Sequence, residues 1–140
     1  MSDEAHNVAM LKSAYARWGE TKGGSVDDWM SICDDNITFG SIAQGSAQPV
    51  AYLTAYSNRA LLKDYFEGLA RDWEMLEYVA EHFVAQGDRV VMLGHCTWRY
   101  KKNGRVVSTP KADSWRIADG KAVEFYEYFD TAQLHSAVAG

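Results

Sequence analysis

The sequence predicts an α+β fold, with helices in the first half of the chain and an antiparallel sheet in the second. Before Tyr78, apolar residues recur at steps of three and four, whereas after it the period changes to two. Three turn signals, Gly87-Asp88, Asn103-Gly104 and Asp119-Gly120, divide the second half into four strands of roughly 8–13 residues. The order of helices and then hairpins favours helices packed on one continuous sheet.

Length and composition indicate one globular domain, residues 1–140, with a sizeable core. Aromatic residues make up 13% of the chain, which suits either a bulky core or an apolar cavity. The net charge is -5 and the longest basic cluster is Lys101-Lys102, so we expect no nucleic-acid partner. The apolar runs are far shorter than the ~18 residues of a membrane-spanning helix, so we expect no membrane segment.

The cysteine and histidine residues predict neither a disulfide nor a metal site. Cys33 and Cys96 are far apart, and no signal peptide precedes them, so we expect a reducing, cytoplasmic location. The four histidines share no spacing typical of metal ligands: His6, His82, His95 and His135.

The first half of the chain contains two predicted helices and a short strand. Residues 3–20 form an amphipathic helix with Leu11, Tyr15 and Trp18 on its apolar stripe, and the glycines after Lys22 end it. Ser25, with an acid three residues later, resembles a capping box that opens a short second helix. After a turn at residues 34–36, residues 37–39 form a short strand, and a small, polar loop follows over residues 40–49.

A further helix is predicted before the sheet. Pro49 could begin a short helical turn through Tyr56, and Asn58 is the expected N-cap of a helix that runs to about Glu77. The apolar stripe of this helix comprises Leu62, Tyr65, Phe66, Leu69 and Trp73. Residues 132–140 form a loose helical tail.

The turns also predict which residues face one another across the sheet. A two-residue turn at Asn103-Gly104 places Gly94 opposite Asp113 and leaves space beside that acid. For the next hairpin we favour a three-residue loop, Ala118 to Gly120, because it aligns the apolar rows of the two strands. That loop places Asp113 opposite Phe125 and Lys111 opposite Glu127.

The two faces of this sheet have different characters. The inner face is apolar and contains Met92, Gly94, Cys96, Trp98, Tyr100, Thr109, Asp113, Trp115, Val123, Phe125, Glu127 and Phe129. The outer face mixes charges with exposed rings and includes His95, Arg99, Tyr126 and Tyr128. Such a mixed face suits a subunit interface, so we expect a homodimer that uses it.

Asp113 and Glu127 are the strongest functional signal, because each carboxyl lies in an apolar row on neighbouring strands. Two carboxyls that approach one another in an apolar pocket do not both ionise easily, so one is expected to serve as an acid or base. A structural alternative remains open. In it, Lys111 pairs with Glu127, and Asp113 bonds to Tyr15 or Trp98.

The last part of the chain, DSWRIADGKAVEFYEYFD, resembles the nuclear transport factor 2-like superfamily. The similarity covers nearly the whole chain and is closest to SnoaL-like polyketide cyclases and ketosteroid-isomerase-related proteins. It implies a cone-shaped, cystatin-like fold in which helices pack on a strongly curved sheet around an apolar pocket. Because this fold hosts many chemistries, the resemblance indicates fold more than activity.

Residue by residue, the resemblance implies parts of two different sites. Ketosteroid isomerases use a tyrosine and a protonated aspartate as an oxyanion hole, and Tyr15 and Asp113 match them; the base position falls at Gly40 or Ser41, which cannot take a proton. Limonene-epoxide hydrolases resemble the chain at GKAVEFYEYFDTAQL, where Glu127 matches one catalytic aspartate. Their partner arginine and aspartate are replaced here by Gly94 and Cys96, so epoxide hydrolysis is not expected.

We therefore expect a small enzyme that moves a proton, without a cofactor, in a small apolar ring or carbonyl compound. Asp113, assisted by Tyr15, would donate to a developing oxyanion, and Glu127 would move the proton. The expected ligand-binding residues are Trp98, Trp115, Phe39, Phe66, Trp73, Phe125 and Cys96. The alternative is a binding or interaction domain without catalysis. It is favoured if side chains close the pocket and Lys111 forms an ion pair with Glu127.

Overall fold

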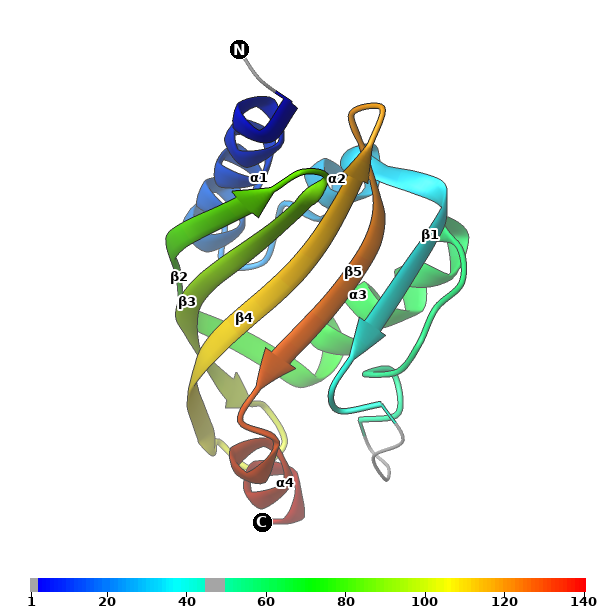
Figure 1. Ribbon diagram of the computed structural model, residues 1–140. Helices are drawn as coiled ribbons and strands as arrows, with labels where there is room; N and C mark the ends of the chain where they lie inside the picture. The colour runs from blue at the N-terminus through cyan, green and yellow to red at the C-terminus, as the bar shows by residue number, and fades with distance from the viewer. Residues whose placement is uncertain (1–2, 45–49) are drawn as a thin grey trace.

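The computed structural model describes residues 3–44 and 50–140 and confirms the α+β fold (Figure 1). Three helices and one strand precede a run of four long strands, and a fourth helix ends the chain. The elements are α1 (Asp3–Glu20), α2 (Val26–Ile32), β1 (Cys33–Ser41), a 3-10 turn (Arg59–Leu61), α3 (Leu62–Asp72), β2 (Trp73–Gln86), β3 (Arg89–Tyr100), β4 (Val106–Ala118), β5 (Lys121–Phe129) and α4 (Thr131–Ala139).

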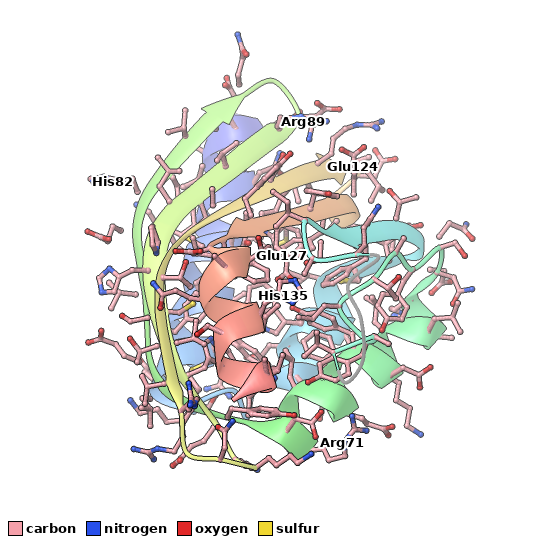
Figure 2. The ribbon with its side chains drawn as sticks, turned by 90° about the horizontal axis from the view of Figure 1, so that it is seen from below. Arg71, His82, Arg89, Glu124, Glu127 and His135 are labelled. Carbon is pink, nitrogen blue, oxygen red and sulfur yellow. The ribbon has the colours of Figure 1, made fainter. Side chains whose placement is uncertain are left out.

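All five strands belong to one sheet in the order β1-β5-β4-β3-β2. The strands β2 to β5 form an antiparallel meander, and β1 joins its edge parallel to β5. Helices α1, α2 and α3 lie on one side of the sheet, and α4 lies at one end of it (Figure 1). The sheet curves around this side, as the view from below shows (Figure 2). The core therefore lies between the concave face and the helices.

Local signals set several helix ends as the sequence predicts. The first helix spans Asp3–Glu20 and buries Leu11, Tyr15 and Trp18, and the chain then turns at Gly23, whose φ is 83°. The side chain of Asn58 accepts a hydrogen bond from the backbone N–H of Leu61 at 3.0 Å, which confirms the predicted N-cap. The capping box predicted at Ser25 is wrong, because that side chain makes no capping hydrogen bond.

Other predicted boundaries are also wrong. The third helix ends at Asp72 rather than near Glu77, and Trp73 begins the strand β2, where it pairs with Tyr100. Cross-strand pairing thus overrides the helical spacing of Trp73. The residues predicted as a turn before residue 37 belong to β1, whose pairing with β5 is irregular there. Pro49 lies outside the described residues, and residues 50–56 contain turns but no helix.

The hairpin between β3 and β4 has a longer loop than the two-residue turn predicted. The backbone N–H of Tyr100 donates to the carbonyl of Arg105 at 2.8 Å, so four residues form the loop. Cα pairing therefore places Lys111, rather than Asp113, opposite Gly94. The pairing differs from the prediction by two residues, so every side chain keeps its predicted face.

The hairpin between β4 and β5 has a two-residue turn, so the predicted three-residue loop, Ala118 to Gly120, is wrong. Asp119 and Gly120 form a two-residue turn with φ values of 51° and 76°, as in a type I′ turn. A register shift follows, because Val123 is an extra residue opposite the step from Arg116 to Ile117. This bulge realigns the apolar rows, and it places Asp113 directly opposite Glu127 rather than diagonal to it.

No helix within the described residues is long and apolar enough to cross a membrane. The core includes side chains from all four α-helices and from every strand. Six polar residues of the described chain are also buried, among them Asp113 and Glu127.

Gly94 is a stringent test of this packing. A Cβ atom at this position would lie 2.0 Å from the carbonyl oxygen of Val79 on β2. The space predicted beside Asp113 is therefore absent at Gly94, and Gly94→Ala must push two strands apart. We expect a loss of roughly 3 kcal/mol in the free energy of unfolding, measured by urea denaturation.

Gly104→Ala is the matched control, because a Cβ there meets nothing within 4 Å and only the φ of 75° is unfavourable. It should lose about 1 kcal/mol. Equal losses for the two variants would contradict the close approach of β2 and β3 at Gly94.

Candidate active site

An apolar cavity of about 110 Å³ lies between the concave face of the sheet and the helices. Its wall is mainly aromatic, and Leu134 of α4 contributes at the end where that helix packs. All ten residues that the sequence predicted as catalytic or ligand-binding line this cavity: Tyr15, Phe39, Phe66, Trp73, Cys96, Trp98, Asp113, Trp115, Phe125 and Glu127.

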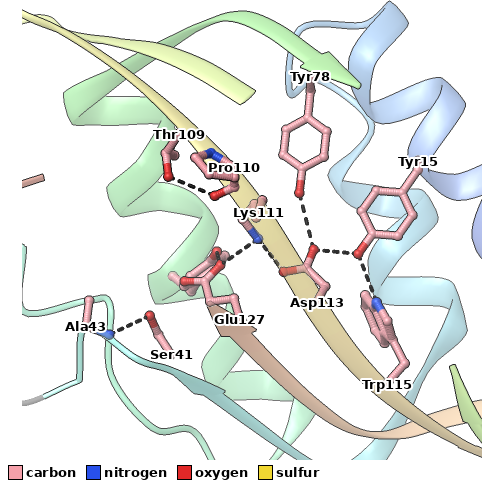
Figure 3. A network of polar contacts seen from close by, with 11 residues as sticks. Tyr15, Ser41, Ala43, Tyr78, Thr109, Pro110, Lys111, Asp113, Trp115 and Glu127 are labelled. Atoms are coloured by element: carbon pink, nitrogen blue, oxygen red, sulfur yellow. Dashed lines mark hydrogen bonds and ion pairs between the residues drawn. The ribbon is translucent and has the colours of Figure 1, made fainter. Parts of the chain in front are cut away.

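Asp113 lies in the middle of β4 and is 1% exposed. Its Oδ2 accepts hydrogen bonds from the hydroxyl of Tyr15 at 2.5 Å and from that of Tyr78 at 3.2 Å. Its Oδ1 accepts from Nζ of Lys111 at 2.5 Å (Figure 3). Asp113 thus accepts three hydrogen bonds in this arrangement, which does not agree with the donor role expected for it.

Glu127 lies opposite Asp113 on β5 and is 2% exposed. Its Oε1 accepts hydrogen bonds from the hydroxyl of Tyr65 at 2.9 Å and from Nζ of Lys111 at 3.2 Å. No described residue donates to the other oxygen, Oε2. Glu127 is part of the cavity wall. Glu127 therefore has one oxygen held by two donors and one oxygen to which no residue of the described chain donates.

Lys111 connects the two carboxylates, although the sequence reasoning gave it no catalytic role. Its side chain is 10% exposed, and Nζ lies 5.8 Å and 5.7 Å from the ring centres of Tyr78 and Phe125. Burial by itself lowers the pKa of Lys111, but the attraction of Asp113 and Glu127 outweighs burial and raises this pKa well above its usual value. Lys111 is therefore an ammonium ion within the cavity wall.

Both contacts of the structural alternative are present. Lys111 pairs with Glu127, and Tyr15 donates to Asp113. The two carboxyls expected to approach one another do so through a cation, because the Lys111 ammonium contacts both of them. One positive charge faces two carboxyl groups, so the cluster carries a net charge of −1 when both are ionised.

Three tyrosines complete the polar network, of which Tyr15 and Tyr65 are buried and Tyr78 is half-buried. Nε1 of Trp115 donates to the hydroxyl of Tyr15 at 2.9 Å, which orients that hydroxyl toward Asp113. Burial, followed by the nearby carboxylate, raises the pKa of Tyr15, Tyr65 and Tyr78 well above the usual tyrosine value. These three phenols therefore remain hydrogen-bond donors.

Sequence reasoning missed Tyr65 and Tyr78 as parts of this network. Tyr65 was visible only as one member of the helical stripe of α3, which is typical of core packing. Tyr78 lies near the start of β2, which begins at Trp73. Because a helix was predicted to about Glu77, the face of the sheet to which Tyr78 points could not be assigned. Lys111 offered a better signal, because it alternates with Asp113 and Trp115 along β4.

The other candidate positions lack reactive groups. Burial raises the pKa of the Cys96 thiol to about 11, so a thiolate nucleophile is not favoured. Gly40 lies under the ring of Tyr126, and the hydroxyl of Ser41 accepts from the backbone N–H of Ala43 at 3.1 Å. The described residues contain no group of three or more potential ligands that could hold a metal ion, and His95 lies on the outer face between two glutamates.

Comparisons with known proteins agree with this architecture. The model of the SnoaL-like domain family matches residues 12–125. None of the curated proteins matches the chain. Among solved structures, an NTF2-like protein of unknown function from Burkholderia pseudomallei has a TM-score of 0.83 at 18% identity, with 100% of both chains covered.

Two further structures have names that refer to activity. A candidate SnoaL-like polyketide cyclase from Jannaschia sp. CCS1 has a TM-score of 0.79 at 17% identity, covering 100% of this chain and 96% of its own. A candidate isomerase from Bacillus subtilis has a TM-score of 0.80 at 17% identity, with 100% and 97% covered. At these identities the similarity shows the fold, and it confirms the predicted cone-shaped architecture.

The buried network predicts a loss of stability in alkali. The pKa values of Tyr15, Tyr65, Tyr78 and Lys111 are raised above the ordinary 10.0 and 10.5. Their contribution to stability is complete below about pH 10 and is lost as pH rises, because the unfolded chain releases these protons first. Urea denaturation should show a fall of about 1.4 kcal/mol per pH unit for each such group above that pH.

Tyr65→Phe should make this fall shallower, because it removes one of the four groups. Absorbance at 295 nm should show that these phenols ionise only when the protein unfolds. Equal stability at pH 8 and pH 11 would contradict a buried, protonated network.

Proposed function

Because the chain belongs to the SnoaL-like domain family, we propose that it is a cofactor-independent enzyme that moves a proton within a small apolar ring or carbonyl compound. The observation that carries the proposal is the state of Glu127. It is a buried carboxylate with Oε1 fixed by two donors and Oε2 free of described donors, in the wall of an apolar cavity. A positioned carboxylate of this kind is suited to general base catalysis.

In the proposed reaction, Oε2 of Glu127 takes a proton from the carbon next to a carbonyl group. The C–H bond breaks, its electron pair forms the enolate, and the negative charge moves to the carbonyl oxygen. The protonated Glu127 then returns the proton to another carbon of the same molecule. Isomerisation needs only these steps, and cyclisation or dehydration can begin with the first of them.

The aromatic wall supports this chemistry by excluding water. Phe66, Trp73 and Trp98 are apolar wall residues, while Phe39 and Phe125 stack on one another with ring centres 4.2 Å apart. The described cavity of about 110 Å³ is smaller than the cavity of about 150 Å³ that accommodates benzene in another protein. The expected substrate is therefore a single small ring, and even that ring requires some side-chain movement.

The ion pair between Lys111 and Glu127 favours a second candidate function, the binding of an apolar ligand without turnover. The ion pair with Lys111 and the hydrogen bond from Tyr65 can stabilise the buried Glu127 carboxylate without any catalytic role for it. The two functions differ in one measurable respect, because only the enzyme exchanges carbon-bound protons of its ligand with solvent.

The first test uses Glu127→Gln, which preserves shape but removes the base. Cyclohexanone in D2O reports proton abstraction by NMR, and cyclohex-3-enone reports proton transfer by its conversion to the conjugated enone. We expect the variant to lower kcat for both probes about 10²- to 10⁴-fold, the usual contribution of a general base.

Glu124→Gln is the matched control, because Glu124 lies on the same strand but points to the outer face. There it pairs with Arg89 at 3.1 Å (Figure 2). This variant should keep full activity. If Glu127→Gln retains the turnover of the wild type, Glu127 is not the base; if the wild type binds the ketones but exchanges no proton, ligand binding is the function.

We also propose that two chains associate through the outer sheet face that contains His95, Arg99, Tyr126 and Tyr128. Cα pairing supports this, because Leu93, Ala112 and Tyr128 form one row across three strands. Leu93 and Tyr128 are 41% and 45% exposed, which leaves an apolar band on a face that is otherwise charged.

Light scattering should give a mass of twice the 15.7 kDa of one chain at micromolar concentration. Tyr128→Lys should shift the protein toward the monomer, whereas Lys102→Glu in the distant loop should not. A wild-type protein that stays at the mass of one chain would rule out this assembly.

A further inference from the structure

We propose that Lys111 is a further catalytic residue of this cavity, whose ammonium group receives the oxygen of a neutral carbonyl substrate as that oxygen becomes negative. This inference rests on the proposed proton transfer to Glu127 and specifies the substrate class for the same site. It also replaces Asp113 as the expected donor to the oxyanion.

The hydrogen bonds of the cavity leave Lys111 available for this role. An ammonium group has three N–H donors. One is committed to Asp113 at 2.5 Å and one to Glu127 at the longer distance of 3.2 Å. No described residue accepts the third, and Nζ lies beside the rings of Tyr78 and Phe125 in the cavity wall.

The three tyrosine hydroxyls of the network are already engaged. Each phenol has one proton to donate. Those of Tyr15 and Tyr78 go to Asp113, and that of Tyr65 goes to Glu127. Within the described cavity wall, Lys111 is the only lysine, arginine or histidine, so it is the one cation there that can oppose a new negative charge.

The balance of charge favours the same assignment. With both carboxylates ionised, Lys111, Asp113 and Glu127 together carry a charge of −1. When Glu127 accepts a proton it becomes neutral, and the substrate becomes an enolate with a charge of −1. The total inside the apolar cavity does not change, and the ammonium exchanges one anionic partner for another. Such a site needs little reorganisation during the reaction.

This balance also selects the substrate. A carboxylate ligand would bring the buried charge to −2, and a phosphate dianion to −3, with only one ammonium to oppose it, which is strongly unfavourable in an apolar cavity. The substrate is therefore a neutral ketone or aldehyde with an acidic C–H beside the carbonyl. Its oxygen would face Lys111 while its α-carbon faces Oε2 of Glu127.

Asp113 becomes a positioning residue in this scheme. Its Oδ1 holds the ammonium of Lys111, and its Oδ2 is fixed by Tyr15 and Tyr78. Its hydrogen bonds thus link α1, β2 and β4 around the one cation in the described wall.

The test uses the enolate of cyclohexane-1,3-dione, which is a stable ring oxyanion at pH 8. Glu127→Gln imitates the protonated base and reduces the cluster charge from −1 to 0. We expect this variant to bind the enolate at least ~10-fold more tightly than the wild type by calorimetry, which corresponds to about 1.4 kcal/mol. Binding of neutral cyclohex-2-enone should change much less.

A second variant separates the ammonium from the overall charge. Lys111→Met combined with Asp113→Asn and Glu127→Gln also has a cluster charge of 0, but it lacks the ammonium. It should lose the tighter enolate binding, while circular dichroism verifies that it is folded. If the triple variant is unfolded, Lys111→Arg with Glu127→Gln replaces it, and the bulkier guanidinium should weaken enolate binding.

The outcomes separate this inference from the proposed function. Tighter enolate binding by Glu127→Gln that is lost in the triple variant supports the role of Lys111 even if the wild type fails to exchange protons of ketones. Equal binding of the enolate by the wild type and Glu127→Gln overturns it, as does undiminished binding by the folded triple variant. In the active enzyme, Lys111→Met should lower kcat about 10²- to 10³-fold with a smaller change in KM.

Discussion

The contact of Lys111 with two buried carboxylates is the interaction on which the rest of the site depends. Asp113 and Glu127 are each almost fully buried and lie directly opposite one another on neighbouring strands. Without a cation between them, two such charges would oppose folding. The ammonium reduces this conflict, and the surrounding phenols donate to Oδ2 of Asp113 and to Oε1 of Glu127.

Which side chains share the concave face could be predicted from the sequence, because alternation along a strand fixes it. Both register predictions were two residues off along most of each hairpin, and an error of two preserves the face. The exception is the bulge, where Ala122 is buried in place of the predicted Val123. Every residue expected in the pocket therefore lines it, although most of their expected partners change. Trp73 lines the cavity from the start of a strand rather than from the predicted helix.

The contacts within the site could not be predicted, because they depend on single residues in the turns. Asp113 pairs with Glu127 because of the bulge at Val123. No feature of the sequence predicts an extra residue at that position. The roles of Tyr65 and Tyr78 depend on helix packing and on a strand start that the helical pattern concealed. The role that we propose for Lys111 follows only when both carboxylates have been placed around its nitrogen.

The parallel pairing of β1 with β5 has one further consequence. The resemblance to ketosteroid isomerases assigns the base to Gly40 or Ser41 on β1, and the Cα partner of Ser41 across the ladder is Glu127. The backbone N–H of Ile42 also donates to the carbonyl of Glu127 at 2.9 Å, so the two chain segments are fastened together at this point. A carboxylate can therefore enter the same region of the cavity from either strand. The position of an acid in the sequence can therefore differ between β1 and β5 while its carboxyl group reaches the same part of the cone.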